Sequence, residues 1–393
     1  MSKLERLIQQ YCPDGVEYVK LDSVANICRG TRVVKSQLSD KGYPVYQNCL
    51  TPMGYFERSN CNAGITFVIC GGAAGNVGYT DVECWAADDC EFIIGGHQVI
   101  NRYIYYYLMT KQNYLLSKVR KASIPRLSPS IIKDLEIPLP PLPVQEEIVR
   151  ILDAFTELQA ELQAELQKRK QQYNYYLDNL LNFKNINRGG YQAEVRWMKM
   201  SEVFEIRNGY TPSKAKKEFW EGGTIPWFRM EDIRQNGRIL SDSILHITPK
   251  GVKGKGLFKA NSFILATTAT IGEHALIIAD SLANQQFTNL SIRKSLENEL
   301  SVKYVYYYFF VIDEWCKANT NVSNFASVDM SKFYNLLIPI PSIAEQQRIV
   351  AILDRFDTLT TDLTQGLPAE IEKRRQQYEY YRDKLLTFKR KGA

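Results

Sequence analysis

The chain has 393 residues, 45% hydrophobic and 23% charged, and its 49 Lys and Arg against 43 Asp and Glu give a net charge of +6. This length and composition suffice for two buried cores of ordinary size and exclude a disordered, collagen-like or disulfide-dense protein. No apolar run approaches the roughly 20 residues of a membrane span, and the charged amino terminus, MSKLERLIQQY, lacks the apolar stretch of a secretory signal. We therefore expect a cytoplasmic protein without a membrane partner. Its eight cysteines include no CxxC pair, so we expect free thiols and no metal site.

The amino-terminal segment mixes strand-like runs, such as ITFVIC at residues 65–70, with glycine-rich turns and short helical patches. This mixture predicts an α/β domain over residues 1–140 without fixing its strand order. The tyrosine block YIYYYL at residues 103–108 has strand-like propensity, but the same spacing of basic and apolar residues continues into MTKQNYLLSKVR. We therefore predict a helix there, with the tyrosines packed in the core.

Residues 141–186 predict one long helix. Apolar positions recur every three or four residues from Val144 to Leu180. A helix of this size would be on the order of 60 Å long, and it needs a partner helix to cover its apolar stripe.

The second half of the chain repeats the first. IPLPPLPVQEEIVRILDAF (137–155) matches IPIPSIAEQQRIVAILDRF (338–356) at an offset of 201, and KRKQQYNYYLDNLLNFK (168–184) matches KRRQQYEYYRDKLLTFK (373–389) at an offset of 205. A second α/β domain is expected at 187–341 and a second long helix at 342–393, with a kink or break near Gly366 and Pro368. The short linker between the copies favours an antiparallel helix pair. The expected fold class is therefore mixed α/β: two α/β domains separated by a long antiparallel two-helix coiled coil, with pseudo-two-fold symmetry.

Basic charge is clustered along the chain. No acidic residue lies between Glu91 and Asp134 or between Asp242 and Glu273, and the second stretch contains the run PKGVKGKGLFK. Lysines beside glycines can follow a phosphate backbone, and Asn, Gln, Thr and Arg are types that read base edges. Solvated loops are the plain alternative, but the set as a whole favours two DNA-binding domains. The candidate contacts are Arg29, Arg32, Lys35, Lys118, Arg120, Lys121 and Arg126 in the first domain, and Lys214, Lys216, Lys217, Trp227, Arg229, Lys250, Lys253, Lys255 and Gln285 in the second.

Motifs for catalysis are missing from the sequence. It contains no NPPY or DPPY motif, no GxGxxG after a strand, no Walker-type phosphate loop and no HExxH. Asp88, Asp89 and Glu91 could suit a metal nuclease, but carboxylates on a turn more often face solvent. We predict that this chain performs no catalysis by itself.

Several motifs of this sequence resemble those of one known protein family. The two IPxP helix starts, the tandem TELQ-AELQ-AELQ at 156–167 and the KRKQQYNYY/KRRQQYEYY pair resemble the specificity subunit of type I restriction–modification enzymes. The GYTP loop, TIPWFRMEDI (224–233) and TTATIG (267–272) look like a target-recognition domain of that family, which adds Tyr210, Thr211 and Thr268 to the candidate contacts. The first domain departs from this pattern, since its loops read GTRVV and GGAAGNVG.

The resemblance implies that each domain reads one half of a bipartite, asymmetric double-stranded DNA site. It implies two adenine-N6 methyltransferase subunits as partners, with restriction and translocase subunits in the full complex. S-adenosylmethionine, ATP and Mg²⁺ would be bound by those partners and no cofactor by this chain. The long helices would then be spacer and methyltransferase docking surface, through Gln145, Ile148, Leu152, Leu158, Leu162, Leu166, Gln346, Ile349 and Leu353.

Two further hypotheses concern the helices. The tandem tetrapeptide would act as a ruler that sets the unread spacer, and the basic triplets at 168–170 and 373–375 would bind DNA or partner subunits, unless they are simply solvated. Two other functions stay open: a standalone DNA-modifying or DNA-cleaving enzyme, and a coiled-coil scaffold that binds DNA without sequence preference.

Overall fold

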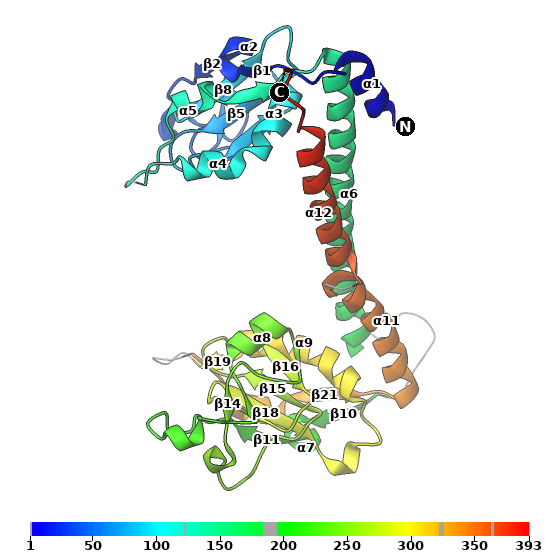
Figure 1. The fold of residues 1–393 in the computed structure, drawn as a ribbon. Helices are drawn as coiled ribbons and strands as arrows, with labels where there is room; N and C mark the ends of the chain where they lie inside the picture. The colour runs from blue at the N-terminus through cyan, green and yellow to red at the C-terminus, as the bar shows by residue number, and fades with distance from the viewer. Residues whose placement is uncertain (1, 122, 184–194, 322–325, 363–364, 393) are drawn as a thin grey trace. The chain divides into compact units, whose positions relative to one another are not determined.

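The computed structural model describes residues 2–121, 123–183, 195–321, 326–362 and 365–392, which form two compact units (Figure 1). The first unit comprises Met1–Glu165 and Ala369–Ala393, and the second comprises Leu166–Pro368. Both mix helices and strands, as the repeat predicted. Among the described helices, none is long and apolar enough to cross a membrane.

The first unit is built on a four-stranded antiparallel sheet in the order β2-β8-β5-β6, formed by Ala25–Arg29, Cys90–Gly95, Ile65–Ile69 and Val77–Thr80. A smaller sheet has the order β4-β3-β7, formed by Tyr55–Phe56, Tyr43–Tyr46 and Trp85–Ala86. Strand β1 (Tyr18–Lys20) pairs with β9 (Glu136–Pro138). The helices are α1 (Lys3–Tyr11), α2 (Leu21–Val24), α3 (Asn101–Thr110), α4 (Gln112–Ser117) and α5 (Pro129–Lys133).

The second unit repeats this plan, with one strand added to the main sheet and an additional hairpin. Its main sheet has the order β11-β18-β15-β16-β13, formed by Phe204–Asn208, Phe287–Ile292, Ser262–Ala266, His274–Ile277 and Ile239–Leu240. The smaller sheet β14-β12-β17 is formed by His246–Ile247, Ile225–Phe228 and Leu282–Ala283, and β10 (Arg196–Lys199) pairs with β21 (Leu337–Ile340). The remaining elements are α7 (Met200–Val203), α8 (Met230–Asn236), α9 (Val302–Ala318), α10 (Met330–Asn335) and the hairpin β19–β20 (Thr320–Asn321, Ser327–Val328).

Both tyrosine blocks are helical, in α3 and α9, and their roles in the core match. Tyr103 donates a hydrogen bond from its hydroxyl to the Pro138 carbonyl at 3.0 Å, and Tyr304 does the same to Pro339 at 3.1 Å. Burial of these phenols raises their pKa well above the ordinary range, so they stay protonated donors. The prediction that the tyrosines pack in the core is therefore confirmed.

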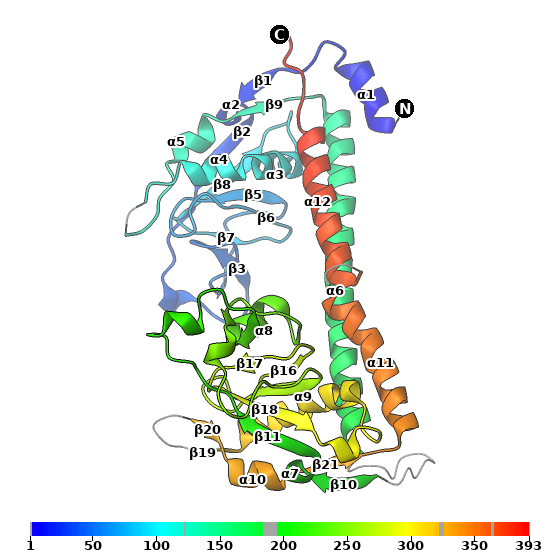
Figure 2. The same cartoon turned by 60° about the horizontal axis from the view of Figure 1, so that its bottom comes forward.

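The long helix is also confirmed, as α6 over Leu142–Leu181. The second one is interrupted near Gly366, as predicted, into α11 (Ile343–Thr361) and α12 (Leu367–Leu385). In the first unit Phe155 of α6 stacks on Tyr381 of α12, and in the second unit Tyr176 of α6 stacks on Phe356 of α11. Each half of α6 thus has a partner helix inside its own unit (Figure 2).

The carboxyl-terminal segment belongs to the first unit. The Val16 N–H donates to the Lys389 carbonyl, the Lys391 N–H donates to Val16, and Arg390 forms an ion pair with Glu136 at 2.5 Å. Residues from both ends of the sequence therefore contact each other within the first unit.

Candidate nucleic-acid interface

The same backbone frame organises the candidate loops of both units. The loop after β2 begins with Gly30 and Thr31, whose N–H groups donate to Cys90 and Ala86, and the loop after β11 begins with Gly209 and Tyr210, whose N–H groups donate to Phe287 and Ala283. A Cβ atom at Gly30 or Gly209 would lie within 2.3 Å of a backbone carbonyl oxygen, so only glycine fits. The first loop of each domain therefore leaves its sheet at an equivalent point.

A tryptophan fixes each of these loops. The Trp85 indole N–H donates to the Thr31 carbonyl at 2.8 Å, and the Trp227 indole N–H donates to Tyr210 at 3.0 Å. Trp227 is 2% exposed and cannot reach a DNA duplex, so its prediction as a DNA contact is wrong. Its role is to position Tyr210. Sequence reasoning missed Trp85 because it lies on β7 whereas Trp227 lies on β12, so the repeats do not align them.

Four predicted cations of the first unit come together. Arg29, Lys118, Arg120 and Arg126 line a cavity of about 380 Å³ that also contains Asp88 and Glu91. Arg29 donates to the Asp88 carbonyl at 2.8 Å, and Arg126 forms an ion pair with Asp89 at 3.1 Å. Glu91 is only 5% exposed, and its burial raises the pKa of its carboxyl against the opposing effect of Lys133 and Arg29. Arg32, Lys35 and Lys121 are exposed on neighbouring loops outside this cavity.

The segment between α4 and α5 contains a basic arm, whose described residues are 118–121 and 123–126. Arg120 and Arg126 exchange both backbone hydrogen bonds, at 2.8 and 3.2 Å, and Leu127 N–H donates to Cys70. The arm is thereby attached to the GGAAGNVG loop between β5 and β6. In the second unit Val328 N–H donates to Thr267, beside a bridge between Thr268 and Ser327. The two glycine- and threonine-rich loops that the sequence matched loosely are therefore structural equivalents, and Thr268 lies half-buried in the second.

The second unit holds its cations on a different loop, between β14 and β15. Lys253 and Lys255 are exposed, and with Arg207, Asn208 and Tyr210 they line a cavity of about 420 Å³ that no acidic side chain lines among the described residues. The Tyr210 hydroxyl accepts from the Lys253 N–H at 2.7 Å, and Arg207 donates to the Gly256 carbonyl at 2.8 Å. The side chains of Tyr210 and Arg207 therefore hold in place a loop that contains three glycines.

The other candidates of the second unit are less concentrated. Lys250 pairs with Glu218 at 3.0 Å and Lys217 with Glu221 at 3.5 Å, whereas Lys214 and Lys216 are exposed. Thr211 donates to Gln285 at 2.5 Å, which joins the first loop to the turn before β18. Arg229 lies at the start of α8, 3.8 Å from Glu231, and lines neither basic cavity.

The predicted docking residues of the helices are mostly internal. Gln145 donates to the Gln98 and Pro140 carbonyls at 2.9 and 2.7 Å and accepts from the Ile100 N–H at 3.0 Å. Gln346 makes the equivalent bonds to Glu299, Pro341 and Ser301, each at 2.8 Å. Both are fully buried, as are Ile148, Leu152, Ile349 and Leu353.

Fully buried side chains cannot contact a partner, so the docking prediction is wrong for these six and they brace the domains instead. Leu158 and Leu162 are half-buried, and Leu166 is 8% exposed. Among the described residues of α6 and α12, the most exposed aromatic side chains are Tyr175 and Tyr380, at 64% and 61%. The QQYNYY and QQYEYY repeats are the sequence signal for these two tyrosines.

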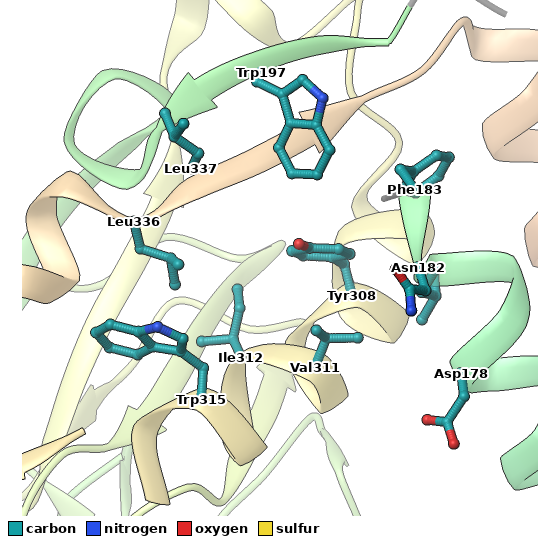
Figure 3. Close-up of a pocket in the computed structure, with 11 residues that line it drawn as sticks. Asp178, Asn182, Phe183, Trp197, Tyr308, Val311, Ile312, Trp315, Leu336 and Leu337 are labelled. Atoms are coloured by element: carbon teal, nitrogen blue, oxygen red, sulfur yellow. The ribbon is translucent and has the colours of Figure 1, made fainter. Parts of the chain in front are cut away.

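A further cavity of about 460 Å³ lies in the second unit and is lined mainly by apolar and aromatic side chains, together with Asp178 and Asn182. Figure 3 shows Trp197, Tyr308, Trp315 and Leu337 facing it, beside the end of α6. Tyr18 occupies the position of Trp197 in the first unit, and there Arg390 covers its ring at 4.6 Å. The apolar lining separates this cavity from the basic surfaces.

Comparisons with known proteins agree with this architecture. The sequence model of the type I restriction modification DNA specificity domain matches residues 13–172 and 192–373. The EcoprrI specificity subunit of Escherichia coli is 54% identical over 204 residues, which is about half of each chain (50% and 51%). The E. coli EcoR124I/EcoR124II specificity subunit is 40% identical over 74% of this chain and 72% of that protein. A putative type I restriction enzyme specificity subunit of Haemophilus influenzae is 31% identical over 98% of both.

Solved structures show the same fold. The S subunit of a type I restriction–modification system from M. genitalium covers 95% of this chain and 96% of its own, with a TM-score of 0.59 and 16% identity. A chain from a study of complex assembly in a type I system gives a TM-score of 0.62 at 16% identity, over 95% of this chain and 98% of that one. With two matched segments on two structural repeats, the chain belongs to the family of type I restriction–modification DNA specificity subunits.

Proposed function

We propose that this chain reads a bipartite, asymmetric DNA site, with each unit binding one half through its own basic loops. The observation that carries the proposal is the repeated frame at Gly30 and Gly209, beside which a cluster of cations lies near the end of the edge strand β2 or β11 in each domain. Cations in this arrangement neutralise phosphates, and the polar side chains beside them, such as Thr211 and Gln285, are types that read base edges. The relatives are named for DNA specificity, which fits this role.

The chemistry would belong to partner subunits. The family resemblance implies two adenine-N6 methyltransferase subunits and restriction subunits, with S-adenosylmethionine, ATP and Mg²⁺ bound by those partners. The chain itself would be the non-catalytic subunit of the resulting nuclease and methyltransferase complex. Because the inner helix residues are buried, we assign docking to the exposed helix faces around Tyr175 and Tyr380. Tyrosine at such positions combines large contact area with a polar tip.

Methylation mapping tests this proposal. The chain is co-expressed with its modification subunit, and N6-methyladenine is mapped across a genome. One bipartite motif with an unread spacer is expected. Modification or cleavage of DNA by the purified chain alone would instead identify a standalone enzyme. Equal affinity for random duplexes, with no motif methylated, would identify a scaffold.

A further inference from the structure

The basic arm of the first unit carries an exposed aliphatic side chain, that of Ile124. Ile124 is 55% exposed, Pro125 is exposed beside it, and Lys121 and Arg126 lie on either side. The arm projects from the domain next to α4 and α5 (Figures 1 and 2). An aliphatic side chain is therefore presented away from the core on a positively charged support.

The base of the arm is fixed. Besides the paired backbones of Arg120 and Arg126, the Gly72 N–H donates to the Pro125 carbonyl at 3.2 Å, and Arg126 is held by Asp89 at 3.1 Å. The backbone next to Ile124 is thus tied to the loop between β5 and β6, and proline restricts it further. A side chain on such a fixed support can press into a bound ligand without being displaced itself.

An exposed isoleucine alone needs no special explanation, and the first unit provides the comparison. Val82 is 53% exposed, but it lies between Asp81 and Glu83, which repel phosphates. Ile124 lies among cations that attract them. The two residues have similar exposure and opposite electrostatic surroundings, so only Ile124 is suited to meet DNA.

We infer that the arm inserts Ile124 between two neighbouring base pairs of the first half-site, while Arg120, Lys121 and Arg126 bind the flanking phosphates. This rests on the proposed function and adds a deformation of the DNA to it. Apolar side chains that DNA-binding proteins insert between base pairs unstack a base step and kink the duplex. The first half-site would be read partly through the ease with which its sequence unstacks.

The second unit does not share this device in its described part. The equivalent hairpin contains Thr320, Asn321, Ala326 and Ser327 among the described residues, none of which is cationic.

The test uses the complex with the modification subunits, on the duplex identified by methylation mapping. 2-Aminopurine, which brightens when it loses its stacking partner, replaces one base at a time in the first half-site, leaving the methylated adenines unlabelled. One step should brighten with the wild-type chain. Ile124→Ala should abolish that signal and weaken binding roughly 10-fold, because the buried side chain is lost; Ile124→Leu should restore both, and the control Val82→Ala should change neither.

Two results would overturn the wedge: no bright step in the wild-type complex, or equal behaviour of Ile124→Ala and Val82→Ala. These outcomes are separable from failure of the proposed function. Loss of Lys253 and Lys255 still weakens binding if the chain reads DNA without a wedge, and it has no effect if the chain does not read DNA.

Discussion

The two units share the same backbone frame but carry their cations on different loops. In the first, the cations come from Arg29 and the arm between α4 and α5, and they share a cavity with buried Glu91. In the second, they come from the lysine-glycine loop between β14 and β15, and the position of Glu91 is taken by Thr288, which donates to Asn208 at 3.2 Å. Loops can change their charge and length without disturbing the sheet that positions them. The difference indicates that the shared frame positions the loops, whereas the side chains of the loops would recognise the DNA.

The largest expected effect concerns the helix that both units share. Residues 156–167 are helical within α6. Inserting one more AELQ after Gln167 would lengthen the helix by ~6 Å and rotate its end by about 40°, which at ~3.4 Å per base pair corresponds to one or two more base pairs of spacer. The methylated motif should keep both half-sites and gain that spacing. Glu161→Gln, which leaves the length unchanged, should give the original motif, and an unchanged motif after the insertion would refute the ruler.

Removing the cations of the second unit comes next. The double variant Lys253→Ala/Lys255→Ala should weaken DNA binding about 10- to 100-fold at physiological salt and reduce the slope of log affinity against log salt by about 2. Titration at several salt concentrations measures both. Lys259→Ala is the control, because Asp280 pairs with that lysine at 2.7 Å. If the control lost as much affinity as the double variant, net charge rather than the loop would explain binding.

The braces at the helix starts should be equivalent in the two units. Gln346→Ala leaves the Ser301 N–H and two carbonyl groups without their buried partner, so a loss of about 2–3 kcal/mol in the free energy of unfolding is expected. Gln145→Ala should cost a similar amount in the first unit. Chemical denaturation of the full chain measures both, and the exposed neighbour Gln347 provides the control substitution, expected within about 0.5 kcal/mol of wild type. If only one of the two substitutions lowered the free energy of unfolding, the two glutamines would not be equivalent.

The smallest effect is a pH dependence that His274 gives to the second unit. His274 is fully buried, and its Nδ1 atom lies 2.7 Å from the Asp313 carboxylate. Arg238 contacts the same carboxylate at 3.1 Å, and Tyr306 packs on the imidazole ring. The first unit has Val77 at the start of the matching strand. Burial is the main cause that lowers the pKa of His274 below its ordinary value of 6.5, with Arg238 adding to it and Asp313 opposing it. The unfolded chain therefore binds the proton first, so stability should be full above pH 6.5 and fall as the pH drops below it.

Melting curves from pH 8 to pH 5 test this dependence. The second unit should lose on the order of 1 kcal/mol per pH unit over part of that range. His274→Gln should flatten this part of the profile, while His97→Gln in the first unit should leave it unchanged. A wild-type profile that His274→Gln does not alter would assign the dependence to other groups.

The sequence allowed prediction of what depends on periodicity and repetition. The long helix and the helical tyrosine blocks follow from spacing that the chain shows twice, and the break near Gly366 follows from the helix-breaking residues Gly366 and Pro368. Strand order could not be predicted, because pairing between β5 and β8 or β3 and β7 depends on long-range contacts. Burial of Gln145 and Trp227 was missed for the same reason: polar side chains look exposed until their backbone partners, far along the chain, are known.

One measurement tests most directly whether each unit reads its own half-site through its own loops. Methylation maps are compared for Lys253→Ala/Lys255→Ala and for Arg120→Ala/Arg126→Ala, each co-expressed with the modification subunit at levels that keep the complex assembled. Each double variant should relax or lose the recognised bases of one half-site, a different half for each, and leave the other half-site unchanged. A map in which both variants degrade the same half-site, or in which each degrades both equally, would contradict the account.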